Sequence, residues 1–379
     1  MPIDAAMCDE HEPWLRLTLT PGIGPVAARR LLEAFGLPED VFAAGRTRIA
    51  AVLDAALAAA LLATDEQRDA RIAAALDWAR GDESHLVTLL DPRYPKPLLQ
   101  IGDPPPLLYV RGCADALSND LLAIVGSRHA TPGGESNARD FARALADEGL
   151  TICSGLARGI DGAAHRGALE GRAGTIAVVG TGVDRVYPAA HRELARTIVQ
   201  RGAIVSELPL GTEVQRANFP RRNRIIAGLS LGVLVVEAAS QSGSLITARN
   251  AAEYGREVMA IPGSIHSPVA RGCHKLIREG AKLVESVEDV LAELRRQMQG
   301  RASAGADRPA AESSQRSVDA AEASPAASAV LSALGWDPVD PDTLVARCAM
   351  RAGDVGAALL ELELAGRVQR WADGRYARA

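Results

Sequence analysis

Short runs of apolar, mostly β-branched residues recur through the middle of the chain and alternate with segments of helical periodicity. The runs are LLAIVGS, LTICSG, TIAVVGTG, AIVSE, GVLVVEA and EVMAIPG, each bounded by Gly, Ser or Pro. After the first run, Ala138, Phe141, Ala142 and Leu145 recur at helical spacing. Apolar strands that alternate with helices indicate a parallel sheet covered on both faces. The pattern predicts an α/β fold with a doubly wound, mostly parallel sheet.

Changes in this pattern divide the chain into four parts. Residues 1–82 are rich in Ala and Leu with helical periodicity, and residues 83–297 hold the predicted sheet. Residues 298–328 contain no aromatic and almost no large aliphatic residue after Met298, so we expect a flexible linker. Residues 329–379 regain periodicity and end in a basic, β-like stretch, which predicts a second small domain.

Composition indicates the compartment. A chain with 47% hydrophobic and 23% charged residues is typical of a globular protein. The N-terminal segment is acidic and lacks an apolar h-region, and no apolar run is long enough to span a membrane. The five cysteines are scattered without a CxxC pair, which is typical of free thiols in a reducing compartment. We expect a cytoplasmic protein with no membrane partner.

The distribution of charge is more informative than its sum. A net charge of −5 argues against a general nucleic-acid coat protein. The basic residues are all arginines apart from Lys96, Lys275 and Lys282. The planar guanidinium of arginine suits the binding of phosphate. Ligands of doubly wound sheets bind beyond the carboxyl ends of the strands. Glycine, hydroxyl and arginine side chains gather in the loops at these ends.

The first of these loops, AIVGSRHATPGG, leaves its strand at Gly126 and continues through Ser127 and Arg128 into a helix. Glycines let the backbone approach an anion, and a helix N-terminus offers unpaired N–H groups. The spacing is not GxGxxG, and no acidic residue ends the second strand, so a dinucleotide site is disfavoured. A tight turn with a solvated Arg128 fits the loop equally well.

The second loop, CSGLARGIDGAAH, offers four candidate residues, which are Ser154, Gly155, Arg158 and Gly159. Arg158 would place a second positive charge beside Arg128. We expect Asp161 to cap the following helix and His165 to pack inside the protein.

The third segment, QRANFPRRNRIIAGLS, covers residues 215–230 and brings arginines together around an aromatic ring, immediately before a predicted helix. Cations for phosphates and a ring for a base are sufficient to bind a single strand, and stacking contributes about 1–3 kcal/mol per base. A solvated charged face, with Phe219 in the core, is the alternative. The candidate residues are Phe219, Arg221, Arg222, Asn223 and Arg224, with Arg216 beside them.

The fourth segment places Ser242, Gly243 and Ser244 at a strand-to-helix turn, which resembles a further anion loop or a simple helix cap. The sequence contains no nucleophile elbow and no P-loop. Its histidines do not pair with Cys or carboxylates at metal-ligand spacing. We therefore expect no catalytic residue, no metal and no cofactor.

In order, YPKPLL, DPPPLLYVRG, VGSR, SGLARGID, TIAVVGTG, FPRRNRIIAGLS and SGSLITA over residues 94–284 resemble the DprA/Smf family of DNA-processing proteins. The resemblance implies an extended Rossmann-like domain that binds single-stranded DNA without sequence specificity. It also implies a homodimer formed through that domain and the loading of RecA recombinase during natural transformation and recombination.

Carried over by motif, the DNA contacts would be Arg128, Arg158 and the FPRRNR group. Two positions depart from the family, because His191 and His274 stand where Asn is usual. Both lie outside the basic loops, so the departures concern local turn geometry more than function.

The flanking segments also resemble known modules. Residues 20–36 resemble a helix-hairpin-helix of a SAM-like domain, in which N–H groups near Gly22 and Gly24 would approach a phosphate. Residues 329–379 resemble a winged helix, with LLELELAG as its last helix and a hairpin turned at Asp373 and Gly374. For the winged helix, binding of a partner or a scaffold role is favoured over base recognition.

Two functions of other classes stay open. Rossmann-like nucleotide phosphoribohydrolases carry PGGxGTxxE, but the nearest strings here, TPGGES and SGSLITA, lack its carboxylate. The other alternative is an adaptor whose sheet edge is purely structural and whose winged helix binds partners.

Overall fold

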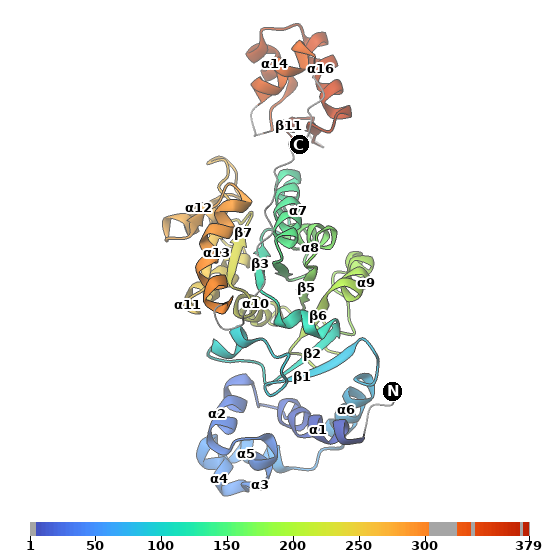
Figure 1. Cartoon of the computed structure of the whole chain (residues 1–379), viewed down its shortest axis with the longest axis vertical. Helices are drawn as coiled ribbons and strands as arrows, with labels where there is room; N and C mark the ends of the chain where they lie inside the picture. The colour runs from blue at the N-terminus through green and yellow to red at the C-terminus, as the bar shows by residue number, and fades with distance from the viewer. Residues whose placement is uncertain (1–4, 303–323, 335–337, 372–373, 379) are drawn as a thin grey trace. The chain divides into compact units, whose positions relative to one another are not determined.

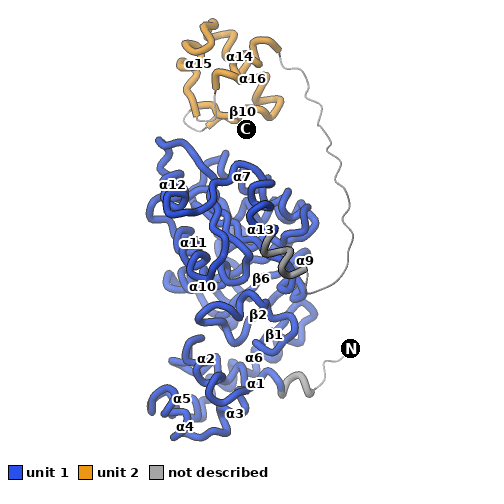
Figure 2. Tube along the Cα trace, turned by 60° about the vertical axis from the view of Figure 1, so that its left-hand side comes forward, with its two compact units in different colours: residues 1–303 blue, residues 304–379 orange. Residues whose placement is uncertain are grey.

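The computed structural model describes residues 5–302, 324–334, 338–371 and 374–378 (Figure 1). The chain divides into two compact units, residues 1–303 and 304–379, which Figure 2 colours separately. Most of the predicted linker, namely residues 303–323, lies outside the described residues. Within the described residues, no helix has the length and apolar character needed to cross a membrane.

The first unit is built on a sheet with the strand order β1-β2-β6-β5-β4-β3-β7-β8-β9. Neighbouring strands from β6 to β9 in this order are parallel, whereas β2 runs antiparallel to both β1 and β6. The six apolar runs form β3 to β8, so the mostly parallel sheet is confirmed. The strands are β1 (Ser84–Thr88), β2 (Leu107–Gly112), β3 (Leu121–Val125), β4 (Thr151–Ser154), β5 (Thr175–Val178), β6 (Ala203–Ser206), β7 (Gly232–Val235), β8 (Glu257–Ala260) and β9 (Lys282–Leu283).

Helices cover both faces of the sheet, as the continuous apolar strands predict. Successive side chains of β3 point to opposite faces, so Leu122 and Ile124 join one core while Ala123 and Val125 join the other. One core includes α7 (Pro132–Asp147), α8 (Ile160–Glu170) and α13 (Val287–Ala302). The other includes α10 (Asn218–Leu229), α11 (Ser244–Glu253) and α12 (Arg271–Arg278).

A third core joins the sheet to the N-terminal helices. Leu15 and Leu19 of α1 and Ile72 of α6 pack with Leu107 and Tyr109 of β2, and α9 (Arg192–Arg201) adds residues to the same core. The other N-terminal helices enclose a separate small core. The small helical region is therefore confirmed. Its helices are α1 (Ala5–Leu19), α2 (Pro25–Phe35), α3 (Pro38–Ala43), α4 (Arg46–Val52), α5 (Ala55–Leu62) and α6 (Glu66–Trp78).

The second unit has its own apolar core. Its helices α14 (Pro325–Leu334), α15 (Pro341–Cys348) and α16 (Ala352–Leu364) precede the antiparallel strands β10 (Val368–Arg370) and β11 (Tyr376–Arg378). Helices followed by a two-stranded wing confirm the winged helix, and α16 is its predicted last helix. Of the predicted turn, Gly374 has a φ of +86°, and Asp373 lies outside the described residues.

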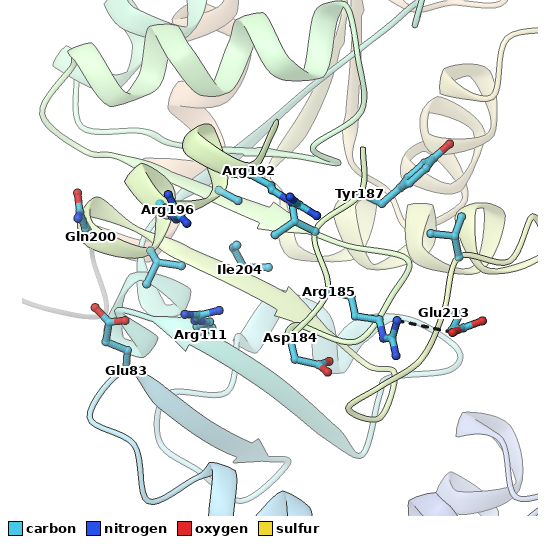
Figure 3. A pocket seen from close by; sticks show the side chains of 14 residues that line it. Glu83, Arg111, Asp184, Arg185, Tyr187, Arg192, Arg196, Gln200, Ile204 and Glu213 are labelled. Atoms are coloured by element: carbon cyan, nitrogen blue, oxygen red, sulfur yellow. Dashed lines mark ion pairs between the residues drawn. The ribbon is translucent and has the colours of Figure 1, made fainter. Parts of the chain in front are cut away.

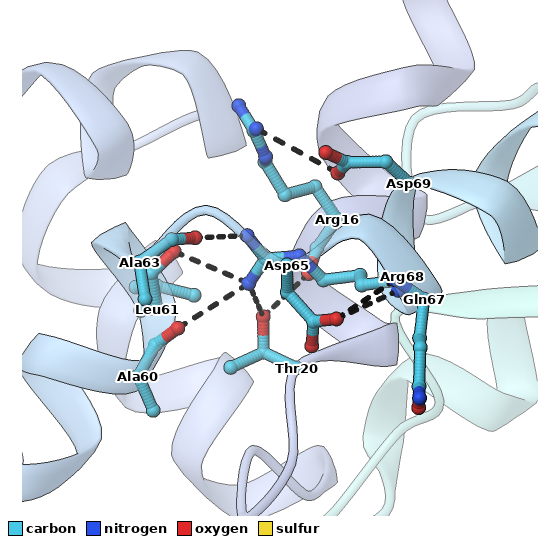
Figure 4. Close-up of polar contacts among 9 residues, drawn as sticks. All are labelled: Arg16, Thr20, Ala60, Leu61, Ala63, Asp65, Gln67, Arg68 and Asp69. Carbon is cyan, nitrogen blue, oxygen red and sulfur yellow. Dashed lines mark hydrogen bonds and ion pairs between the residues drawn. The ribbon is translucent and has the colours of Figure 1, made fainter.

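The N-terminal helices are held together by a buried cation. Arg68 of α6 is 2% exposed, and its guanidinium donates to the hydroxyl of Thr20 at 3.1 Å and to the carbonyl of Ala60 at 3.3 Å (Figure 4). It also donates to the carbonyl of Ala63, which ends α5. Carbonyls at a helix C-terminus lack partners within the helix and carry partial negative charge, so a cation is favourable there.

We expect Arg68→Ala to lower the free energy of unfolding by about 3 kcal/mol, because it leaves buried acceptors without donors. Urea denaturation with hydrogen exchange over α1, α5 and α6 measures the loss. Arg71→Ala is the matched control, since this side chain is exposed on the same helix, and a change within about 0.5 kcal/mol is expected. Equal losses in both variants would show that the buried hydrogen bonds of Arg68 add nothing to the free energy of unfolding.

Candidate nucleic-acid interface

The loops that follow β3, β4 and β5 and the start of α10, which follows β6, meet at the end of the sheet where the parallel strands end. We call this surface the rim. Arg128 follows β3, Arg158 follows β4, and Phe219 belongs to the first turn of α10. Gly159, in the loop after β4, packs directly against the loop after β3. A Cβ at this position would lie 2.3 Å from the carbonyl oxygen of Ser127, so only glycine allows the two loops to come this close. Its φ of +71° also favours glycine. This close approach brings Arg128 and Arg158 to the same part of the surface.

Phe219 forms a half-buried aromatic surface on the rim. The guanidinium carbon of Arg128 lies 5.0 Å from the centre of its ring. The ring of Tyr187 lies 6.0 Å away, centre to centre, at an interplanar angle of 44°. Behind it, Gly180 leaves space, since a Cβ there would lie 3.3 Å from Phe219 Cδ1. Phe219 is therefore not a core residue, and the sequence did not single out its neighbour Tyr187.

The arginines beside Phe219 lie within α10 and not before a helix, which corrects the sequence prediction. The helix starts at Asn218, and Pro220 is accommodated in its first turn, where the missing N–H has no intrahelical partner. Helical geometry then sends successive arginines in different directions. Arg221 is exposed, whereas Arg222 and Arg224 are 5% and 7% exposed.

Arg222 points into the protein beneath the rim. Its Nη1 donates to the carbonyl of Val178 at 3.0 Å and lies 1.5 Å from where a Cβ of Gly155 would be. Burial lowers the pKa of Arg222, and the nearby negative charge of Asp161 partly offsets this. The glycine at position 155 makes room for an internal cation, so Arg222 is corrected from a surface contact to a structural residue.

Arg224 is also structural. Its Nε forms an ion pair with Asp103 at 3.1 Å, and its Nη2 pairs with Glu207. Burial raises the pKa of Glu207, and the positive charge of Arg224 opposes this shift. The predicted exposed FPRRNR group is therefore divided, with Arg221 at the surface, Asn223 half-buried and the other two arginines inside.

The N-terminus of α7 already holds an anion of the protein. Glu237 accepts hydrogen bonds from the backbone N–H of Thr131 at 2.9 Å and from its hydroxyl at 2.6 Å. Thr131 caps the helix by accepting from the N–H of Gly134 at 2.9 Å. Burial raises the pKa of Glu237, and the hydrogen bonds from Thr131 counteract it. Of the two interpretations of this loop, an anion site or a tight turn, the occupied N–H groups favour the tight turn at this helix start.

The loop after β4 is occupied in a similar way. Helix α8 begins at Ile160, so Asp161 lies in its first turn and does not cap it, contrary to the prediction. Its carboxylate accepts from the N–H groups of Gly155 at 3.1 Å and Ala157 at 3.4 Å. Burial raises the pKa of Asp161, and the positive charge of Arg222 opposes the shift. The backbone N–H groups of Gly155 and Ala157 are therefore satisfied internally.

The remaining predicted residues separate by exposure. Ser154 is fully buried and donates to the carbonyl of Ile124 at 2.6 Å, while Ser127 is 9% exposed. Asn223 donates to the carbonyl of Gly243 at 3.2 Å, which joins α10 to the start of α11. Gly126, Asn223 and Ser242 are half-buried, Gly155, Gly159 and Ser244 are buried, and Arg128, Arg158, Arg221 and Gly243 are exposed.

The exposed arginines of the rim form no ion pair with any residue that the structure describes. Within the described residues, Arg128, Arg158 and Arg221 have no carboxylate at ion-pair distance. The described part of the chain also contains no group of three His, Cys, Asp or Glu side chains that could hold a metal. The rim therefore presents available positive charge and an aromatic ring.

His165 is packed beneath the same loop, as predicted. Its Nε2 accepts from the N–H of Leu156 at 3.2 Å, and its Nδ1 lies 2.7 Å from the hydroxyl of Thr175. That hydroxyl donates to the carbonyl of Ile152, so Nδ1–H must be the donor to Thr175. Burial, with smaller contributions from His191 and Arg222, lowers the pKa of His165 to about 3.

Two family models match the sequence. DNA recombination-mediator protein A matches residues 85–295, and the DprA winged helix domain matches residues 312–374. Protein Smf of Escherichia coli strain K12 is 43% identical over 78% of each chain. Protein Smf of a Synechocystis strain is 35% identical and covers 97% of this chain and 99% of its own.

Two solved structures are similar. The DNA processing protein A of Streptococcus pneumoniae has a TM-score of 0.66 and 38% identity, covering 77% of this chain and 99% of that chain. That of Helicobacter pylori, solved for its single-stranded DNA binding mode, has a TM-score of 0.51 and 29% identity. It covers 56% of this chain and 97% of that chain.

We expect the buried, neutral His165 to make folding sensitive to acid. The unfolded chain binds this proton near pH 6.5 and the folded chain near pH 3, so between these values the unfolded state holds more protons. Stability then falls by about 1.4 kcal/mol per pH unit below 6.5 from this group.

Urea denaturation between about pH 5 and 7 measures the effect, and His165→Gln should flatten this dependence even where it lowers overall stability. His129→Gln is the control, because His129 is exposed on the loop after β3. An unchanged slope in His165→Gln would contradict the neutral state of His165.

Proposed function

The chain belongs to the DNA recombination-mediator protein A family, and from this premise we propose that its rim binds single-stranded DNA without sequence specificity. The observation that carries the proposal is the pairing of Phe219 with Arg128, beside further exposed arginines that have no ion-pair partner among the described residues. The accessible part of an aromatic ring stacks on any base, and arginine binds the phosphate that every nucleotide carries. The Helicobacter pylori protein with a single-stranded DNA binding mode supports the same ligand here.

We propose that the protein binds without chemical turnover. The segments nearest to a nucleotide-hydrolase signature, residues 131–136 and 242–248, lie at the starts of α7 and α11, and neither matches PGGxGTxxE. Glu237 is engaged at the start of α7. The relatives are DNA-processing proteins, which favours binding over the nucleotide-processing alternative. A nucleotide-hydrolysis assay with rim variants tests this.

We further propose that the bound strand is delivered to RecA recombinase in the cytoplasm during transformation and recombination. The support is the family itself, that of a recombination mediator. Strand-exchange assays with RecA test the step, since Arg128→Ala should weaken the stimulation in proportion to its loss of DNA affinity. A variant that binds no DNA and still stimulates RecA would contradict delivery.

A homodimer through the sheet domain is the proposed assembly. Strand β9 ends the sheet, both of its residues are exposed, and Leu283 is 41% exposed. Edge strands expose unpaired backbone groups that a second chain can bind. Sedimentation of the chain measures its oligomeric state, and a monomer at all concentrations would refute the proposal.

We expect Arg128→Ala and Arg158→Ala each to remove one phosphate contact. The slope of log affinity against log salt should then fall by about 0.7 per contact for a single strand. Oligo(dT) binding titrated at several salt concentrations measures this. Arg128→Lys should rescue only in part, because a point charge replaces a planar fork. Arg143→Ala, an exposed arginine on α7, is the control with an unchanged slope.

Phe219→Ala should behave differently from the arginine variants. Loss of a stacked base weakens binding by about 1–3 kcal/mol while the salt slope stays nearly constant. Phe219→Trp should retain stacking and most of the affinity. Thermal melting of each variant separates binding from folding. Wild-type affinity in Phe219→Ala would exclude the ring as a stacking surface.

A further inference from the structure

A long groove begins beside the rim and follows α9. It has a volume of about 840 Å³ and is lined by the exposed side of α9, by β6 and β2, and by the loop that contains Tyr187 (Figure 3). Figure 3 shows Arg192, Arg196 and Gln200 along the helix and Arg111 across from them. None of the residues that the sequence assigned to DNA lines this groove.

Tyr187 connects the groove to the rim. It lines the groove, and its ring lies 6.0 Å from that of Phe219, centre to centre. The side chain is 47% exposed, which leaves part of the ring open to a ligand. Two adjacent rings at the start of a groove are suited to consecutive bases of one strand.

Some charged side chains of the groove already have partners within the protein, and others do not have one among the described residues. Arg185 pairs with Glu213 at 3.6 Å, and the carboxylate of Asp184 accepts from the N–H of Gly211 at 3.0 Å. Arg196 pairs with Glu193 on its own helix at 2.6 Å.

Arg192 and Arg111 remain, and neither has a carboxylate at ion-pair distance within the described residues. Glu83 lies at the far end of the groove, beside Arg111 in Figure 3. Its side-chain carboxylate has no hydrogen bond or ion pair with a described residue. Near Tyr187, Arg192 is therefore the lining cation that no described carboxylate pairs with.

The start of α9 is fixed to the rim by His191. Its Nδ1–H donates to the carbonyl of Leu156 at 3.0 Å, in the loop that carries Arg158. The ring also packs closely on α8, because a Cβ at Gly162 would lie 2.8 Å from His191 Cε1. Arg192 follows directly in the chain, so its position relative to the rim is set by this contact.

We propose that the groove is a second subsite for the same DNA strand. Tyr187 stacks on the base next to the one on Phe219, and Arg192 and then Arg111 bind the phosphates that follow. This proposal rests on the proposed function of the rim and extends it along α9. The ligand is a continuous polynucleotide, because one nucleotide cannot occupy both the ring of Phe219 and the far end of the groove.

The test compares fluorescent oligo(dT) of two lengths, about two and about twenty nucleotides, on the full chain. The short strand can reach only the two rings, whereas the long strand also continues to Arg192 and Arg111. In Arg192→Ala with Arg111→Ala, the salt slope for the long strand should fall by about 0.7 per contact and that for the short strand should not change. Tyr187→Leu should weaken the long strand about fivefold or more, and Tyr187→Phe should bind like wild type.

Arg143→Ala controls for the loss of an exposed arginine elsewhere, and a melting curve on each variant controls for folding. For the Arg192 and Arg111 double variant, equal effects on both lengths, or no effect on either, would overturn the subsite while leaving the rim intact. Failure of the unsubstituted chain to bind either strand would overturn the proposed function and the subsite together. Loss for the long strand alone supports the path along α9.

Discussion

The geometry of the rim depends on the burial of one guanidinium. Arg222 reaches from α10 under the loop after β4, where Gly155 leaves it space, and donates to the carbonyl that ends β5. A buried charge is tolerated only with compensating partners. Helix α10, the loop after β4 and the end of β5 must therefore keep their relative positions. Phe219 lies on that helix and Arg158 on one of those loops. The exposed contacts of the surface are thus positioned by an arginine that no ligand reaches.

The sequence predicted the sheet well because apolar runs report burial directly. It could not tell which arginines near Phe219 are buried and which are exposed, because a run of charged residues does not show where each side chain points. Asn218, Arg222 and Ile225 share one side of α10 at helical spacing and are buried, while Arg221 faces out. The predicted helix began after these arginines, so its periodicity did not extend to them. The short antiparallel strands β1 and β2 carry weaker signals than the six central runs.

Contacts between distant parts of the chain were also beyond the sequence. Glu237 follows β7 yet satisfies Thr131, 106 residues earlier, because β3 and β7 are neighbours in the sheet. Tyr187 becomes part of the rim only through the fold, which brings its ring to that of Phe219. The sequence did carry a signal for it, because Gly180, Gly182 and Arg185 precede it after the strand run TIAV, as glycine and arginine do in the other loops. The low content of aromatic residues, 3%, was a second signal.

The internal carboxylates have a consequence for selectivity. Glu237 and Asp161 occupy backbone donors that in other sheets of this architecture hold the phosphates of nucleotides. With those donors filled, a free mononucleotide or inorganic phosphate can engage only isolated side chains, each of which contributes little alone. A polymer engages many of them at once, so its affinity rises through multivalency. On the proposed function, the protein would thus distinguish a strand from the abundant pool of cellular nucleotides.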